Sequence, residues 1–233
     1  MSKTEHQPPT KESLSNYDHC VERVVKRGLA VVELNYGPGS NDPRPYHGPE
    51  HTLFVTGAAA ILADQAIDRG SISASQKGLL RIAASYHDVV NDKGAEDNEM
   101  KSAVVAARHM RMLTTFSESQ VRQVVEAILA TRVREVSPDH IVQSADESNY
   151  LGMLLADADL SALGSPVDIF WPVAQRFFAE SQPEQPLTGE ALRQFAHDQI
   201  TLVGGHNYYT EEARQTFNHQ PEIIEFLQTM LAK

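Results

Sequence analysis

The sequence predicts an all-α protein, a single compact array of about nine or ten helices. Hydrophobic residues recur at helical spacing along most of the chain, as at Tyr17, Val21 and Val24. No segment carries the sustained alternation of polar and apolar residues that is typical of a strand. The connections between helical stretches are short, which favours helices packed closely in one array.

Hydrophobic spacing predicts the first helix, and each later helix expected in the first half of the chain has a start signal, which is a proline in the first turn, an N-cap residue or a capping box. Glycine or a polar segment marks most of the ends. The expected helices are residues 12 to 35, Pro49 to Gly70, Ser73 to about Val90, Asp97 to Leu113, and Ser117 to Leu129.

Similar signals divide the second half of the chain. Ser144 and Glu147 form a further capping box, which predicts a helix that begins there and ends at Gly164. Pro183 and Pro186 are expected to end the next helix. The remaining expected helices are Ser165 to the Phe177 region, Thr188 to the break at Gly204 and Gly205, Glu211 to Phe217, and Pro221 to Ala232.

Residues 1–11 are polar and contain two prolines, so we expect a flexible tail before one helical domain at 12–233. The tail has no apolar stretch of the kind that a secretory signal contains. No run elsewhere reaches the length of a membrane span. Cys20 is the only cysteine, which excludes an intrachain disulfide framework and favours a cytoplasmic location.

The net charge of −11 argues against a protein that grips nucleic acid, since phosphate backbones attract basic surfaces. It argues equally against binding to an anionic membrane surface. An acidic protein can still bind a phosphate ester where a metal ion supplies positive charge locally.

Three polar segments fall on helix faces that the pattern predicts to be buried. His51 lies in the first turn after Pro49, and His87 shares the apolar face of Ala83. Asp159 lies on the stripe of Leu155, one turn further along the chain.

Asp157 precedes Asp159 by two residues and lies about 200° away around the helix, so only Asp159 is expected to face such a site. A buried carboxylate is costly unless it is paired or bound to a metal ion. Imidazoles and carboxylates that converge from separate helices would bind a divalent cation, with Mn, Mg, Zn, Co and Fe all compatible with mixed N and O ligands. For each residue alone, a structural role is the alternative, as a hydrogen-bonded core histidine, a buried cap or an ion-pair partner.

Four short strings resemble those of the HD-domain metal-dependent phosphohydrolases. Residues 46–51 (YHGPEH) resemble the YHxxxH string that opens many of these domains, and residues 84–90 (ASYHDVV) resemble the HD helix. Residues 157–164 (DADLSALG) resemble the DxDLxxLG form of the last motif. The Asn-Glu and Ser-Ala pairs within 98–103 resemble the NExxSA string of a poorly characterised bacterial branch of predicted HD hydrolases.

The resemblance implies a set of metal ligands, a proton donor and an activity. His51, His87, Asp88 and Asp159 match the metal ligands, and His47 matches the group that protonates the leaving group in cyclic-nucleotide phosphodiesterases. The implied activity is hydrolysis of a phosphate ester or nucleotide by metal-activated water. The alternatives are a di-iron HD-type oxygenase and a non-catalytic, metal-binding regulatory HD module.

Two positions depart from the strings that they resemble. Gly48 stands where the phosphodiesterases usually have Asn after the first His. Residues 87–92 are close to the HDVVED string of (p)ppGpp hydrolases, in which an acidic pair positions the attacking water. Asn91 replaces the first acid of that pair, so only Asp92 is left to take this catalytic role.

Further charged residues flank the motifs. Glu99 is a candidate partner of a metal-bound histidine, with ordinary stabilisation of a helix N-terminus as its alternative. Arg44, Lys93 and Lys101 are candidate phosphate-binding residues, and a solvated surface charge is the alternative for each.

A second metal ion is a further alternative, since some HD proteins hold two and use additional histidines. His109 lies one helix beyond the HD pair, and His140 follows in an expected loop.

Overall fold

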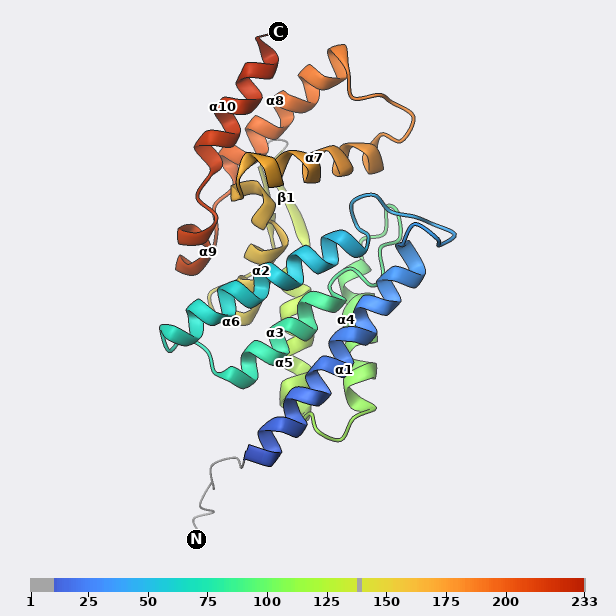
Figure 1. The fold of residues 1–233 in the computed structure, drawn as a ribbon, viewed down its shortest axis with the longest axis vertical. Helices are drawn as coiled ribbons and strands as arrows, with labels where there is room; N and C mark the ends of the chain where they lie inside the picture. The colour runs from blue at the N-terminus through green and yellow to red at the C-terminus, as the bar shows by residue number, and fades with distance from the viewer. Residues whose placement is uncertain (1–10, 138–139, 233) are drawn as a thin grey trace.

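The computed structural model describes residues 11–137 and 140–232, with side chains for 16–134 and 142–232. Within these residues it contains ten α-helices, one short 3-10 helix and one two-stranded hairpin, which confirms the all-α prediction (Figure 1). The expected tail at 1–11 lies outside the described residues except for Lys11, which is already helical.

The helices of the first half begin close to the predicted positions. Both capping boxes, at Ser73 and at Ser117, are formed with reciprocal hydrogen bonds to the residue three positions later. Their bounds are α1 Lys11–Tyr36, α2 Pro49–Asp68, α3 Ala74–Tyr86, α4 Asn98–Arg111, and α5 Glu118–Ala130.

The second half is built from shorter helices. The 3-10 helix η1, Ser161–Gly164, follows directly after α6, so the predicted continuous helix to Gly164 is interrupted at Leu160. The bounds are α6 Tyr150–Asp159, α7 Val167–Ser181, α8 Gly189–Gly205, α9 Glu211–Thr216, and α10 Gln220–Leu231.

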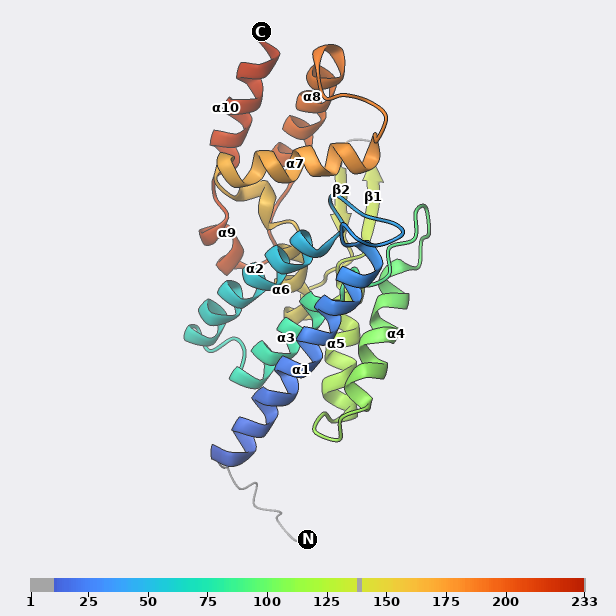
Figure 2. The ribbon, with the colours of Figure 1, turned by 45° about the vertical axis from the view of Figure 1, so that its right-hand side comes forward.

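A β-hairpin stands where the sequence predicts no strand. Strand β1, Val133–Ser137, pairs antiparallel with β2, His140–Gln143. The register shifts between Glu135 and Ser137. This bulge interrupts the two-residue alternation by which a strand is recognised in a sequence. The hairpin extends from the end of α5 toward α7 and α8 (Figure 2).

The predicted helix start at Ser144 is also wrong. The Ser144 backbone and hydroxyl both donate to the Arg132 carbonyl, which closes the base of the hairpin. Helix α6 begins six residues later, where the Asn149 side chain accepts a hydrogen bond from the Gly152 amide. The Ser144 hydroxyl is therefore bonded within the hairpin and does not cap a helix, and Asn149 is the N-cap residue of α6.

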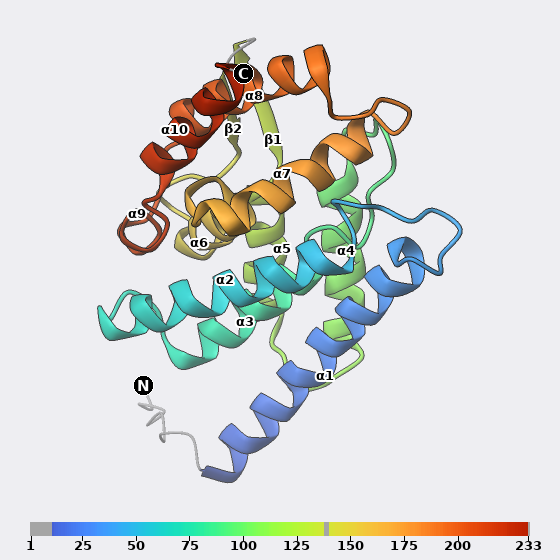
Figure 3. The same cartoon turned by 45° about the horizontal axis from the view of Figure 1, so that its top comes forward.

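The apolar side chains form two cores. The larger core is made mainly by α1 to α6, and Leu154, Leu62 and Ile128 are among its fully buried residues. The smaller core joins η1 with α7, α8 and α10 around Phe170 and Leu227. Helix α7 lies beside the beginning of α2, where Arg176 pairs with Glu50 at 2.8 Å (Figure 3).

Close contact between α1 and α3 fixes the position of the HD segment. A methyl group at Gly28 would lie 2.6 Å from the Ser85 carbonyl oxygen and 2.7 Å from the Tyr86 ring. Glycine therefore allows α1 to pack directly on the last turn of α3, which immediately precedes His87. None of the described helices combines the length and apolar character needed to cross a membrane.

Candidate metal centre

Three helix ends bring two histidines and two aspartates together. His51 lies in the first turn of α2, His87 directly follows α3, and Asp159 is the last residue of α6. The Nε2 atom of His51 is 3.1 Å from Asp159 Oδ1 and 3.3 Å from His87 Nε2. The donor atoms of these three residues all lie within 4.8 Å of one another.

Asp88 completes the cluster from the turn after α3. Its Oδ2 atom is 3.3 Å from His87 Nε2 and 3.5 Å from His51 Nε2. Around a single cation with metal–nitrogen bonds of about 2.1 Å, tetrahedral ligands lie about 3.4 Å apart. The separations of 3.1–3.5 Å that join the two histidines to each other and to each aspartate match the edges of one coordination sphere. His51, His87 and Asp159 could therefore hold a divalent cation, and Asp88 lies beside the two histidines.

A hydrogen bond orients the His87 ring. Its Nδ1 donates to the Ala84 carbonyl at 2.8 Å, because a carbonyl oxygen can only accept. In the neutral imidazole the lone pair then lies on Nε2, which faces His51 and the two carboxylates. This arrangement of a fixed tautomer and an inward lone pair is the one that metal-bound histidines adopt.

The hairpin supplies a residue that the sequence did not reveal. The Gln143 amide nitrogen donates to Asp159 Oδ2 at 2.8 Å, which leaves Oδ1 directed at His51. Gln143 is buried, and its carbonyl accepts a hydrogen bond from the Tyr209 hydroxyl. Only recognition of the strand would have placed Gln143 beside the motif of α6.

Asp157 and Asp159 separate as the helical geometry predicts. Asp157 is fully buried away from the cluster and accepts hydrogen bonds from the Tyr209 amide and from the Thr210 amide and hydroxyl. Burial raises the pKa of Asp157 to about 6, against the lowering effect of these hydrogen bonds. Asp157 thus secures the segment before α9 and takes no part in the cluster.

Burial and neighbouring charges shift the pKa values of His87, Asp88 and Asp159. Burial by itself would lower the pKa of His87, but the negative charge of Asp88 and hydrogen bonds to Asp159 and Asp88 raise it well above its usual range. Burial opposes ionisation of the two carboxyl groups, and the adjacent imidazoles nevertheless lower the pKa of Asp88 strongly and that of Asp159 to about 2. Both aspartates are therefore anionic and available as oxygen ligands near neutral pH.

Glu180 of α7 is a second residue that the sequence did not reveal. Its Oε1 accepts a hydrogen bond from His47 Nδ1 at 2.6 Å, and its Oε2 accepts from the backbone amides of Tyr46 and His47. Burial lowers the pKa of His47, but the bond to Glu180 and the charges of Asp88 and Glu180 outweigh it and raise that pKa. His47 is thus held beside the cluster as a partly exposed imidazole, with a ring centroid 6.0 Å from that of His51.

The departure at Gly48 has a structural reason. Gly48 is the N-cap residue of α2, and a Cβ atom there would collide with the Arg44 carbonyl oxygen. The tight connection that holds His47 against Glu180 therefore leaves no room for the Asn side chain of the phosphodiesterase string.

Arg44 is buried and already bonded to other parts of the protein. Its guanidinium donates to Asp42 Oδ2 at 2.7 Å and to the Asn91 carbonyl at 3.0 Å, and it lies 3.8 Å from Glu180. These contacts favour a structural role, in which Arg44 joins the loop before α2 to the segment after Asp88.

Asp92, Lys93 and Lys101 lie on the surface beside the cluster. Asp92 pairs with Lys101 at 3.0 Å, and Lys101 also pairs with Asp97. Lys93 is exposed. The pairing of Asp92 with Lys101 favours solvated surface charges over a role for Asp92 in positioning water.

Glu99 lies close enough to the cluster for the charges of Asp88 and Asp159 to affect its pKa. Partial burial raises the pKa of Glu99, and the negative charges of Asp88 and Asp159 raise it further. Its position in the first turn of α4 therefore combines the helix-stabilising role with proximity to the candidate ligands.

Of the two additional histidines, His109 lies apart from the cluster. His109 Nδ1 is 2.7 Å from the Tyr86 hydroxyl, on the side of α3 that faces α4. His140 lies in β2 rather than in the expected loop, and its side chain is outside the described part of the chain.

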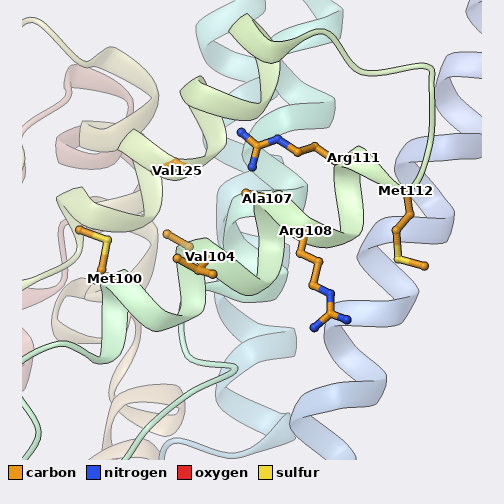
Figure 4. Close-up of a pocket in the computed structure, with 8 residues that line it drawn as sticks. Met100, Val104, Ala107, Arg108, Arg111, Met112 and Val125 are labelled. Atoms are coloured by element: carbon orange, nitrogen blue, oxygen red, sulfur yellow. The ribbon is translucent and has the colours of Figure 1, made fainter.

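A separate surface hollow of about 490 Å³ lies between α4 and α5 (Figure 4). Met100, Val104 and Arg108 line it, and none of the candidate site residues does. The hollow is thus independent of the cluster.

Comparison with known proteins adds no assignment. No protein-family model matches the chain, and no curated protein matches its sequence.

Proposed function

We propose that the protein is a metal-dependent phosphohydrolase that cleaves a phosphate ester or a nucleotide with metal-activated water. The observation that carries the proposal is the convergence of His51, His87 and Asp159, with Asp88 Oδ2 within 3.5 Å of both histidines. A bound divalent cation would lower the pKa of a water molecule and neutralise phosphate oxygens. This agrees with the resemblance to HD-domain phosphohydrolases.

The charge of the site supports a cation as part of the substrate-binding surface. Asp88, Asp159 and Glu99 all bring negative charge to this region, and the guanidinium of Arg44 is bonded within the protein. A phosphate anion would be repelled by this surface unless a metal ion compensated the carboxylates.

His47 has the properties of a general acid. Glu180 holds its Nδ1, so Nε2 is the ring nitrogen left to face a substrate. The bond to Glu180 and the nearby negative charges raise the pKa of His47 despite burial and so favour its protonated form, which general acid catalysis requires beside the leaving oxygen. In this role His47 donates its proton to the departing alkoxide, while Glu180 stabilises and orients the imidazole.

The surroundings of the cluster give less support to the alternatives. A di-iron oxygenase needs ligands for a second iron, and His109 is instead hydrogen-bonded to Tyr86. A regulatory module with a degenerate site would be expected to lack one of the four ligands, and the set is complete. We propose a cytoplasmic protein with a small-molecule phosphate ester or nucleotide as its partner.

Metal content and a substrate screen test the proposal together. Elemental analysis of the purified protein should find one exchangeable divalent ion per chain, whereas two irons would support the oxygenase and bound metal without any hydrolysis would support the regulatory module. The metal-loaded protein should hydrolyse members of a panel of nucleotides, cyclic nucleotides, (p)ppGpp and model phosphodiesters. Absence of hydrolysis across the panel with each of Mn²⁺, Mg²⁺, Zn²⁺, Co²⁺ and Fe²⁺ would contradict the proposal.

A further inference from the structure

An apolar cavity of about 220 Å³ adjoins the candidate metal centre. Asp159 and Tyr46 line the cavity and also contact His51 of the candidate metal centre. Asp159 Oδ1 lies 3.1 Å from His51 Nε2, and the Tyr46 ring stacks on the His51 ring at a centroid distance of 4.7 Å. A group bound in the cavity would therefore lie beside the candidate cation.

The walls of this cavity come from the smaller core. Tyr46 also packs edge-on against Phe177 at 5.3 Å, which joins the cluster to the far wall. Val133 and Phe177 are 51% and 40% exposed, so they form the mouth. The apolar lining residues are Leu160, Ala162, Leu163, Phe170, Val173 and Ala174.

The charge of the lining disfavours anionic groups in the cavity. Among the residues whose side chains the structure describes, Asp159 is the only charged one that lines the cavity, and no Lys or Arg does. A second phosphate or another anionic group would be desolvated there without a partner. The cavity is also smaller than the roughly 300–1,000 Å³ that hold whole drug-sized ligands, so it suits one part of a ligand.

Gln199 adds a specific polar contact. It is 5% exposed, it lines the cavity, and its side-chain amide has no hydrogen-bond partner among the described residues. Its amide atoms remain open to a bound molecule or to water, which can pair with them. The lining is thus mostly apolar and includes the Gln199 amide, and ligand sites usually have this composition.

We propose that this cavity binds the alcohol part of the substrate, and that this part is a small, uncharged, largely apolar alkyl or aryl group with one hydrogen-bonding atom for Gln199. The inference rests on the phosphohydrolase function proposed above. It narrows the substrate class to phosphate esters of such alcohols and excludes esters that carry further charge on the alcohol side.

Binding of simple alcohols tests the cavity without metal or catalysis. Affinities for ethanol to hexanol, measured by ligand-observed NMR, should rise about fourfold per methylene, the equivalent of ~0.8 kcal/mol, until the cavity is full. Ala174→Phe should remove this dependence because it fills the cavity. Ala107→Phe is the matched control, since Ala107 is also 5% exposed but lines the α4–α5 hollow, and it should leave the affinities unchanged.

Two further variants test the cavity independently of Ala174→Phe. Val173→Phe, at a half-buried wall position, should act like Ala174→Phe if the latter fails to fold by circular dichroism. Gln199→Leu should weaken 1,5-pentanediol relative to pentanol by about fivefold, as expected for one lost hydrogen bond. Affinities that do not depend on chain length, or that no cavity variant alters, would overturn the inference.

Alkyl phosphates then separate this inference from the function on which it rests. The alcohols of the series differ little in acidity, so kcat/KM for hydrolysis should follow the fourfold steps of alcohol binding. A kcat/KM that does not vary with chain length would refute the cavity assignment but would still support the phosphohydrolase function. Chain-length-dependent alcohol binding without any hydrolysis would refute the phosphohydrolase and leave an apolar ligand site.

Discussion

Asp157 and Asp159 are two residues apart in α6, yet they act in different parts of the molecule. Asp159 Oδ1 lies 3.1 Å from His51 Nε2 in the candidate metal centre. Asp157 accepts three hydrogen bonds from Tyr209 and Thr210, which precede α9. The 3.6-residue turn directs the two carboxylates to different sides of one helix.

This division predicts opposite effects for the two alanine variants. Asp159→Ala should weaken metal binding more than tenfold, because the cation loses a ligand. Asp157→Ala should retain the metal but lower the free energy of unfolding by roughly 3 kcal/mol, since two buried backbone amides lose their acceptor. Elemental analysis and urea denaturation measure the two effects.

The other three ligands provide the control for this comparison. His51→Ala, His87→Ala and Asp88→Ala should each reduce bound metal as Asp159→Ala does. Metal loss in Asp157→Ala with retention in Asp159→Ala would contradict the ligand assignment.

Gln143→Leu should weaken metal binding by about 10- to 100-fold, as is typical when a partner of a metal ligand is removed. The reason is that Gln143 holds Asp159 Oδ2 and so directs Oδ1 at the cluster. Competition with a metal chelator measures the affinity. Gln123→Leu, on a surface turn of α5, is the matched control, and equal affinities in both variants would exclude a positioning role for Gln143.

His47→Ala should keep the metal and slow hydrolysis by roughly 10²- to 10⁴-fold if the imidazole is a general acid. The loss should shrink for nitrophenyl esters, whose leaving groups need little protonation. Steady-state kinetics on good and poor leaving groups, with metal analysis of the same samples, checks this. Equal losses would indicate substrate positioning, and loss of metal would make His47 a ligand.

The His47–Glu180 pair should make stability depend on pH in a defined window. Hydrogen bonding and the charge of Glu180 and nearby carboxylates raise the pKa of His47 above 6.5 despite burial, so its contribution is present below pH 6.5 and is lost as pH rises through the folded value. Despite burial, His47 lowers the pKa of Glu180 from 4.5 to about 2, so that contribution is present above pH 4.5 and is lost toward pH 2.

Glu180→Gln therefore should destabilise the protein most between pH 4.5 and 6.5, by about 1–2 kcal/mol. The difference from wild type should decline on both sides of this window, as measured by urea denaturation across pH. Glu184→Gln, at an exposed position after α7, is the control and should show no such window. A difference that does not vary with pH would show that the pair is not ionised in the folded protein.

Much of the secondary structure could be read from local sequence because its signals are local. The capping boxes at Ser73 and Ser117 and the proline at the start of α2 set helix ends through contacts within one turn. Ser144 carries the same signal and fails, because its hydroxyl bonds to Arg132 across the hairpin. A capping signal is thus decisive only where no more distant partner takes the same side chain.

The sequence alone determined the helical class and the separation of Asp159 from Asp157, because both follow from helical periodicity. It also identified the four candidate ligands, because they lie in short motifs. Tertiary structure decided which residues support them. Gln143 and Glu180 come from a bulged strand and from a helix more than 130 residues after His47, and neither belongs to a local pattern. The cavity beside Asp159 likewise forms only on folding, because its walls come from the loop before α2 and from β1, α6, η1, α7 and α8.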